Sequence, residues 1–339
     1  MANNLNLNKL SDIIKGSGKV VIISHANPDG DAIGSSLALH LFLKKLGVES
    51  KVVLPNDYPM FLAWLPSVED IVIYDKDTVS AFEILKNADL FCYLDFNMES
   101  RTGLMHNDLC SLNNTPKVLI DHHLGTDFSK YKAAFSETAK SSTSELVAEF
   151  IKYHGFDEYL DKDIATCLMT GIITDTGSFS HSVDFSTFNI CGELLSTSID
   201  YKKIHQNIYD NSTEDRLRLL GFLIKDRMTV LKEYNTAYIY ATKSDLEVYN
   251  YQIGDTEGVV NYPLSIDSVR MSVLITERQG VIRFSFRSKG DFSVNDLAKK
   301  HFAGGGHRNA AGGTLTCTLE QAVQKLLSIL PEYQKLLTE

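Results

Sequence analysis

The chain has 339 residues, of which 44% are hydrophobic and 22% charged, and its formal net charge at pH 7 is −10. This length predicts two domains. The acidic balance excludes a protein that coats nucleic acid by bulk electrostatics. No run of 18 or more apolar residues occurs, which excludes a membrane span.

The five cysteines are scattered, and none forms a CxxC pair. This pattern argues against a disulfide scaffold and against a thiolate zinc site. The first 16 residues are polar with scattered aliphatic side chains, and they lack the apolar core of a signal peptide. We therefore expect a cytoplasmic protein that does not attach to a membrane.

The first half of the chain alternates strand-like and helix-like segments, a pattern typical of a mostly parallel sheet with helices on both faces. Short apolar runs predict strands at Lys19–Ser24, Ser50–Leu54, Ile71–Tyr74, Leu90–Asp95 and Lys117–Ile120. Helical spacing predicts helices at Asp31–Leu46, Ser142–His154 and Lys162–Ile173. The expected fold class is α/β.

The pattern changes after residue 186, where a polar, helical stretch without a good strand extends to residue 225. Beyond it we predict strands at Arg227–Leu231, Thr236–Ala241, Val269–Thr276 and Val281–Arg287, and helices at Val294–Phe302 and Leu319–Leu330, the second ending at Pro331. The predicted organisation is a first domain over residues 1–190, a helical connector over 191–225 and a smaller α+β domain over 226–339.

Charge is distributed unevenly between these parts. Residues 214–339 hold 16 of the 33 Lys and Arg and 15 of the 43 Asp and Glu, so residues 1–213 hold the remaining 17 basic and 28 acidic groups. Arg101 is the only arginine before residue 214, and eight follow it. An acidic first part and an arginine-bearing second part predict two different chemical roles.

Clusters of acidic and histidine residues occur where we expect strands to end, which is where parallel sheets place their ligand sites. The first is HANPDGDAIGS, with His25, Asp29 and Asp31. The second is Asp95 in FCYLDFN, and the third is the tripeptide Asp121-His122-His123 after KVLI. The fourth is Asp175 in GIITDTGSFS.

Imidazole and carboxylate together suit Mn²⁺, Fe²⁺, Co²⁺ or Zn²⁺, and carboxylates suit Mg²⁺ and Mn²⁺ best. Two divalent cations would neutralise this convergence of carboxylates and prepare a bridging hydroxide, as in many phosphate-ester hydrolases. Taken singly, each aspartate has a plainer interpretation as a helix cap or a turn residue. Asp121 can orient a neighbouring histidine instead of binding a metal itself. Asn27 can shape the turn within HANPDGDAIGS.

These motifs resemble those of the DHH superfamily of phosphoesterases, which is named after the tripeptide at Asp121. The segment HFAGGGHRNAAGG, from His301 to Gly313, resembles the glycine-rich motif of the DHH-associated C-terminal domain. The resemblance implies one metal held by His25, Asp29 and Asp95, and a second held by Asp31, Asp95, His122 and Asp175. It implies that His123 faces the substrate phosphate. The ions are expected to be Mn²⁺, with Mg²⁺ or Co²⁺ as alternatives.

The glycine-rich segment has a chemistry of its own, because glycine lets backbone N–H groups approach a phosphate closely. We expect Gly305, Gly306, His307 and Arg308 to bind substrate there, together with Arg287 in FSFRSKG, since a guanidinium fork suits phosphate oxygens. The plainer interpretation is a flexible loop with an incidental arginine.

The length and two-domain plan resemble the branch of the superfamily that degrades very short RNA and removes phosphate from 3′-phosphoadenosine 5′-phosphate (pAp). We therefore predict hydrolysis of short oligoribonucleotides to mononucleotides, of pAp, or of both, through Asp95, His122 and His123. The alternatives are an exopolyphosphatase, a dinucleotide phosphodiesterase, and a nucleotide-binding protein that kept the fold without activity. The sequence leaves open the preferred substrate, the direction of degradation, the native metal, and whether the chain forms a homodimer.

Overall fold

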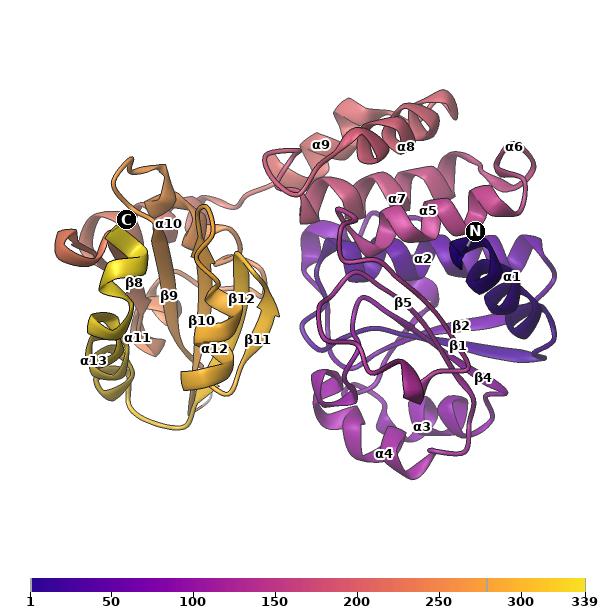
Figure 1. The fold of residues 1–339 in the computed structure, drawn as a ribbon, viewed down its shortest axis with the longest axis horizontal. Coiled ribbons are helices and arrows are strands. Elements are labelled where there is room, and N and C mark those ends of the chain that lie inside the picture. The colour runs from indigo at the N-terminus through magenta and orange to yellow at the C-terminus, as the bar shows by residue number, and fades with distance from the viewer. Residues whose placement is uncertain (1, 279, 339) are drawn as a thin grey trace. The chain divides into compact units, whose positions relative to one another are not determined.

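The computed structural model describes residues 2–278 and 280–338, and the chain divides into two compact units, Met1–Asn211 and Ser212–Glu339. Figure 1 draws the first unit in indigo to rose and the second in orange to yellow. The predicted domain boundaries at residues 190 and 226 stay predictions. The residues between them are shared, because two of their helices belong to the first unit and one to the second.

The first unit contains a six-stranded, wholly parallel sheet with the strand order β3-β2-β1-β4-β5-β6. Its strands are β1 (Lys19–Ile23), β2 (Glu49–Leu54), β3 (Ile71–Ile73), β4 (Leu90–Leu94), β5 (Lys117–Asp121) and β6 (Ala133–Ser136). Strand β1 is central, with Ile22 opposite Val52 of β2 and Cys92 of β4. The predicted α/β class is confirmed, and β6 is a strand that the sequence did not reveal.

Helices cover both faces of this sheet, as predicted (Figure 1). One face carries α1 (Ala2–Lys15), α2 (Gly30–Lys45), α5 (Thr143–Tyr153) and α7 (Lys162–Asp175), with α6 (Phe156–Tyr159), α8 (Phe185–Ser196) and α9 (Tyr201–Tyr209) beyond. The other carries α3 (Thr78–Lys86), the 3-10 helix η3 (Glu99–Met105) and α4 (His106–Ser111). Alternate residues of β1 therefore enter different cores: Ile22 packs on the first face and Ile23 on the second.

The second unit contains a mixed sheet with the order β11-β12-β10-β9-β8-β7, in which only β8 and β9 run parallel. Its strands are β7 (Met228–Leu231), β8 (Thr236–Ala241), β9 (Met271–Arg278), β10 (Val281–Ser288), β11 (Gly305–His307) and β12 (Ala310–Leu315). Its helices are α10 (Glu214–Asp226), α11 (Lys243–Val248), α12 (Val294–His301) and α13 (Leu319–Thr338). This is the predicted α+β arrangement.

Two local predictions for this unit are wrong. Helix α13 does not end at Pro331 but continues to Thr338, because buried Leu337 packs into the core and its carbonyl oxygen accepts a hydrogen bond from Asn235 Nδ2. These contacts compensate for the hydrogen bond that proline cannot donate. The glycine-rich segment is not a loop but the hairpin of β11 and β12, with Gly306 opposite Ala311.

A helix must be both long and apolar to cross a bilayer, and within residues 2–278 and 280–338 no helix meets both conditions.

A candidate metal centre at the carboxyl edge of the first sheet

The turn after β1 brings His25 and Asp29 together. Asp29 caps α2, because its Oδ1 accepts hydrogen bonds from the backbone N–H groups of Asp31 and Ala32, each at 3.1 Å. Its other oxygen, Oδ2, lies 4.0 Å from His25 Nε2. The capping and metal-binding interpretations of Asp29 are thus compatible, since each uses a different oxygen.

Asp95 lies at the middle of the cluster. Its Oδ2 is 3.3 Å from His25 Nε2, and its Oδ1 is 3.5 Å from His122 Nε2 and 3.6 Å from His123 Nδ1. The residue directly follows β4 and has a φ of 64°, a left-handed conformation that aspartate and asparagine tolerate better than most residues. This backbone conformation turns the buried carboxylate toward histidines from two neighbouring strands.

The second group consists of Asp31, His122 and Asp175. His122 Nε2 lies 3.5 Å from Asp175 Oδ2 and 4.0 Å from Asp31 Oδ2. Asp31 is almost completely buried and is held by the N-terminus of α5, where the backbone N–H groups of Thr143 and Ser144 donate to its carboxylate at 2.7 and 2.8 Å. The positive end of that helix stabilises the carboxylate.

We expected Asp175 to follow a strand, and this is wrong: Asp175 is the last residue of α7, the helix that we predicted at Lys162–Ile173. It reaches the site because α2 and α7 pack very closely. A Cβ at Gly34 would lie only 2.4 Å from the carbonyl oxygen of Cys167, so only glycine allows this approach. The apolar run before Asp175 is buried as part of this helix.

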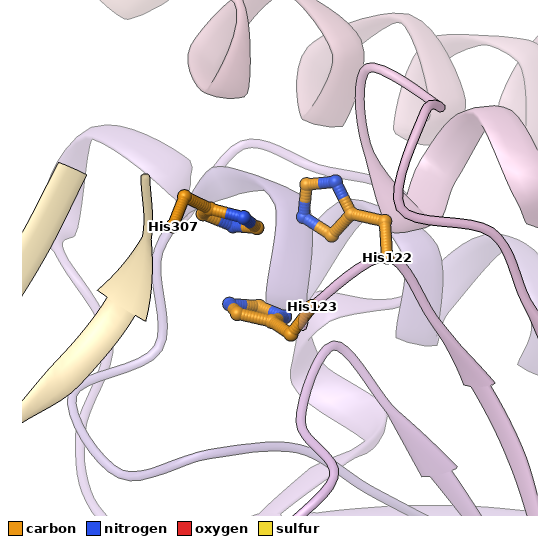
Figure 2. A group of neighbouring side chains, drawn as sticks. All are labelled: His122, His123 and His307. Carbon is orange, nitrogen blue, oxygen red and sulfur yellow. The ribbon is translucent and has the colours of Figure 1, made fainter. Parts of the chain in front are cut away.

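His122 and His123 leave β5 as neighbours, with ring centroids 5.0 Å apart and planes at 80° (Figure 2). His123 Nδ1 lies 2.7 Å from Oδ1 of the buried Asp121, and His122 Nδ1 lies 3.3 Å from the carbonyl oxygen of Lys140. With Nδ1 facing Lys140, the Nε2 atom of His122 faces Asp31, Asp95 and Asp175.

The carboxylates and imidazoles of the site strongly shift one another's pKa values. Burial, followed by the charges of Asp95 and Asp175, raises the pKa of Asp31 well above its ordinary value. Burial alone would lower the pKa of His122, but the nearby aspartates, Asp175 first, raise it well above the usual range. Such shifts indicate negative charge that the protein itself does not compensate.

The described residues fit two divalent cations. Ligand atoms of His25, Asp29 and Asp95 lie within 4.8 Å of one another, and so do those of Asp31, His122 and Asp175. Both sets combine imidazole with carboxylates, a donor chemistry that suits Mn²⁺ and its neighbours in the series. Asn27 lies beside the first set in the left-handed region, with a φ of 56°, and its N–H donates to Asn56 Oδ1 at 2.7 Å.

The predicted substrate-binding residues lie together in the second unit. Gly305, Gly306 and His307 form β11, Arg308 lies in the hairpin turn, and Arg287 is near the end of β10. Some of their groups already have partners: the Gly306 N–H donates to Asn295 Oδ1 at 2.9 Å, and Arg308 donates to the carbonyl oxygen of Asp291 at 2.8 and 3.1 Å. A phosphate bound here would compete with these contacts.

Part of the site comes from α5 and η3, and no sequence motif indicated it. Besides its backbone contact with Asp31, Thr143 donates from Oγ1 to Asp95 Oδ1 at 3.1 Å. Arg101 Nη1 donates to the carbonyl oxygen of Asp95 at 3.4 Å. The pattern Ser142-x-x-Glu145 marks the start of a helix, but it does not show that the helix points at the site.

The chain matches two family models, the DHH family N-terminal domain over residues 19–172 and the DHHA1 domain over residues 236–335. It is 29% identical to the bifunctional oligoribonuclease and PAP phosphatase NrnA of Thermus thermophilus over 95% of this chain and 93% of that protein. It is 27% identical to the cyclic-di-AMP phosphodiesterase PdeA of Listeria monocytogenes over 96% of this chain but only 49% of that protein.

The crystal structure of an exopolyphosphatase-related protein from Bacteroides fragilis is similar over 99% of this chain and 98% of that chain, with a TM-score of 0.91 and 39% identity. The matched regions contain the motifs at His25–Asp31, Asp95, Asp121–His123 and His301–Gly313, although the motif around Asp175 lies just beyond the first region, and the resemblance is thereby confirmed. The chain belongs to the DHH family of phosphoesterases, is a hydrolase of phosphoric esters and carries a DHHA1 domain.

Proposed function

We propose that this protein uses two divalent cations, in the first place Mn²⁺, to hydrolyse short oligoribonucleotides to mononucleotides and to remove phosphate from pAp. The observation that carries the proposal is the convergence of six metal-ligand side chains at one sheet edge: His25, Asp29, Asp31, Asp95, His122 and Asp175. The choice of substrate is supported by the similarity to NrnA over almost the whole of both chains.

In this proposal each side chain has a role that follows from its position. When bound, the two ions supply positive charge for the phosphate oxygens and lower the pKa of a water molecule. Asp95 lies between the two ligand groups and is suited to bind both ions. His123, whose Nδ1 lies 2.7 Å from Asp121 Oδ1, contacts the phosphate or the leaving oxygen in this proposal. Burial lowers the pKa of His123, and the contacts with Asp121 and Asp95 oppose this shift.

The substrate assignment is tested by hydrolysis with Mn²⁺ of a set of compounds: RNA dimers to pentamers, a 20-nucleotide RNA, pAp, cyclic and linear dinucleotides, pyrophosphate and polyphosphate. We expect kcat/KM to be highest for the shortest RNAs and for pAp. The acidic first unit should disfavour long polymers, whose affinity depends on many positive contacts. Turnover confined to polyphosphate would instead favour the function suggested by the Bacteroides protein, and turnover confined to cyclic dinucleotides would favour that of PdeA.

We further propose that Arg308 and His307 bind a substrate phosphate. Replacing Arg308 by alanine should raise KM for pAp by about 10- to 100-fold with little change in kcat, because a charge-assisted hydrogen bond contributes ~1.5–3 kcal/mol. Arg218→Ala is the matched control, since Arg218 is an exposed arginine of the same unit that pairs with Glu214 on the surface of α10. Equal KM values for the two variants would contradict the assignment.

A further inference from the structure

Three side chains of different chemistry meet in the first unit, apart from the candidate metal centre. Cys110 Sγ lies 3.7 Å from Glu99 Oε2 and 3.7 Å from each ring nitrogen of His106. Ligand atoms of all three residues lie within 4.8 Å of one another. His106 and Cys110 are four residues apart on α4, so they lie one above the other on one face of that helix, and Glu99 comes from the preceding η3.

The Glu99 carboxylate is fixed in place by its other oxygen. Its Oε1 accepts a hydrogen bond from Lys117 Nζ at 2.5 Å and another from Tyr93 Oη at 2.7 Å. Burial by itself would raise the pKa of Glu99, but these contacts, Lys117 first, lower it. The carboxylate is therefore ionised at neutral pH, and its Oε2 faces the thiol. Metal sites commonly fix a ligating carboxylate in this way.

The separation between the sulfur and the carboxylate is that expected around a tetrahedral ion. Zn²⁺ bonds of about 2.0–2.3 Å place neighbouring ligand atoms about 3.3–3.8 Å apart in a tetrahedron. The sulfur–oxygen separation of 3.7 Å lies in this range. The sulfur is equally far from both nitrogens of His106, so the ring has to rotate to direct one nitrogen at the ion. Cys110 is exposed, and Glu99 and His106 also line a polar cavity of about 940 Å³, so an ion can reach the cluster and keep a water or a small ligand as its fourth partner.

We propose that Glu99, His106 and Cys110 form a further metal site, specific for a thiophilic divalent ion such as Zn²⁺ or Co²⁺. The Cys110 thiol loses its proton to solvent when the metal–sulfur bond forms. The site shares no residue with the candidate metal centre, whose donors are only imidazole and carboxylate and which suits Mn²⁺. The missing CxxC pair had argued against a thiolate zinc site, but here a single thiolate is completed by a histidine one helical turn away and by a carboxylate.

A cobalt titration distinguishes this site from the candidate metal centre, because only a thiolate ligand gives the near-ultraviolet sulfur-to-cobalt absorption. The full chain is titrated with Co²⁺ under a phosphine reductant that does not chelate metals. We expect the band to saturate at one Co²⁺ per chain in the wild-type protein and to be absent in Cys110→Ser. His106→Ala should weaken cobalt binding by at least about 10-fold.

Cys317→Ser is the matched control, since it removes a partly exposed thiol from the second unit and should leave the band unchanged. Circular dichroism verifies that each variant is folded, and equilibrium dialysis with Zn²⁺ should show one ion fewer per chain in Cys110→Ser. A band that persists in Cys110→Ser, or one that is unaffected by His106→Ala, would overturn the proposal. So would a folded wild-type protein that shows no band at saturating cobalt.

Discussion

Asp95→Asn is expected to lower kcat for the best substrate on the order of 10³-fold, the size of effect seen when a central electrostatic group is removed from an active site. The Asp95 carboxylate lies within 3.6 Å of three histidines, His25, His122 and His123. Replacing it by an amide removes the negative charge between the two ligand groups. Asparagine adopts the left-handed φ of 64° as readily as aspartate, so the backbone is not strained.

The control is Asp267→Asn, the same change at an exposed aspartate of the second unit, which should leave kcat unaltered. Metal content is measured alongside by mass spectrometry, and we expect bound Mn²⁺ to fall in Asp95→Asn only. Wild-type rates from a folded Asp95→Asn protein would eliminate the proposed mechanism.

Glu145→Ala is expected to lower the free energy of unfolding by about 3 kcal/mol, because it breaks a buried charge network. The Glu145 side chain is fully buried on α5. Its Oε1 accepts from Ser186 Oγ at 2.6 Å and pairs with Lys140 Nζ at 3.3 Å, and its Oε2 accepts from Ser141 Oγ at 2.6 Å. Alanine leaves these groups without their shared acceptor. Urea denaturation at pH 7 measures the effect.

The same carboxylate makes stability depend on pH. Burial alone would raise the pKa of Glu145, but hydrogen bonds from Ser141 and Ser186 and the Lys140 charge lower it. Its contribution is therefore present above the ordinary pKa of glutamate, near 4.3, and is lost as the pH falls through the lower value of the folded protein. In Glu145→Gln the free energy of unfolding should decrease less steeply as the pH is lowered through this range. This account would be contradicted if Glu145→Gln showed the same pH dependence as the wild type at acid pH. It would also be contradicted if Glu145→Ala lost no stability.

The sequence predicted the parts of the site that follow directly from strand ends. His25, Asp95 and His122 come shortly after β1, β4 and β5, and parallel pairing brings those ends together. Position along the chain cannot show which helix ends at the same edge. The origin of Asp175 in α7 depends on close packing at Gly34, a tertiary contact with no local signal beyond one glycine.

Packing also explains the other errors in the sequence predictions. Proline disfavours a helix interior, but the buried Leu337 keeps α13 helical beyond Pro331. Consecutive glycines suggest a loop, yet Gly304 lies so close to β12 that a Cβ there would come within 1.9 Å of the Gly312 carbonyl oxygen. In both places the contacts made by distant residues outweigh the local preference of the chain.

The ligands of the candidate centre are contributed by four separate segments, from His25 after β1 to Asp175 at the end of α7. During synthesis the carboxylates of Asp31 and Asp95 emerge long before Asp175, and α5, which holds Asp31, emerges later than both. The complete set of ligands therefore exists only after about the first 175 residues have folded together. An ion that needs the complete set would bind the native first unit in preference to any nascent fragment, and its supply would then stabilise the finished fold relative to its intermediates.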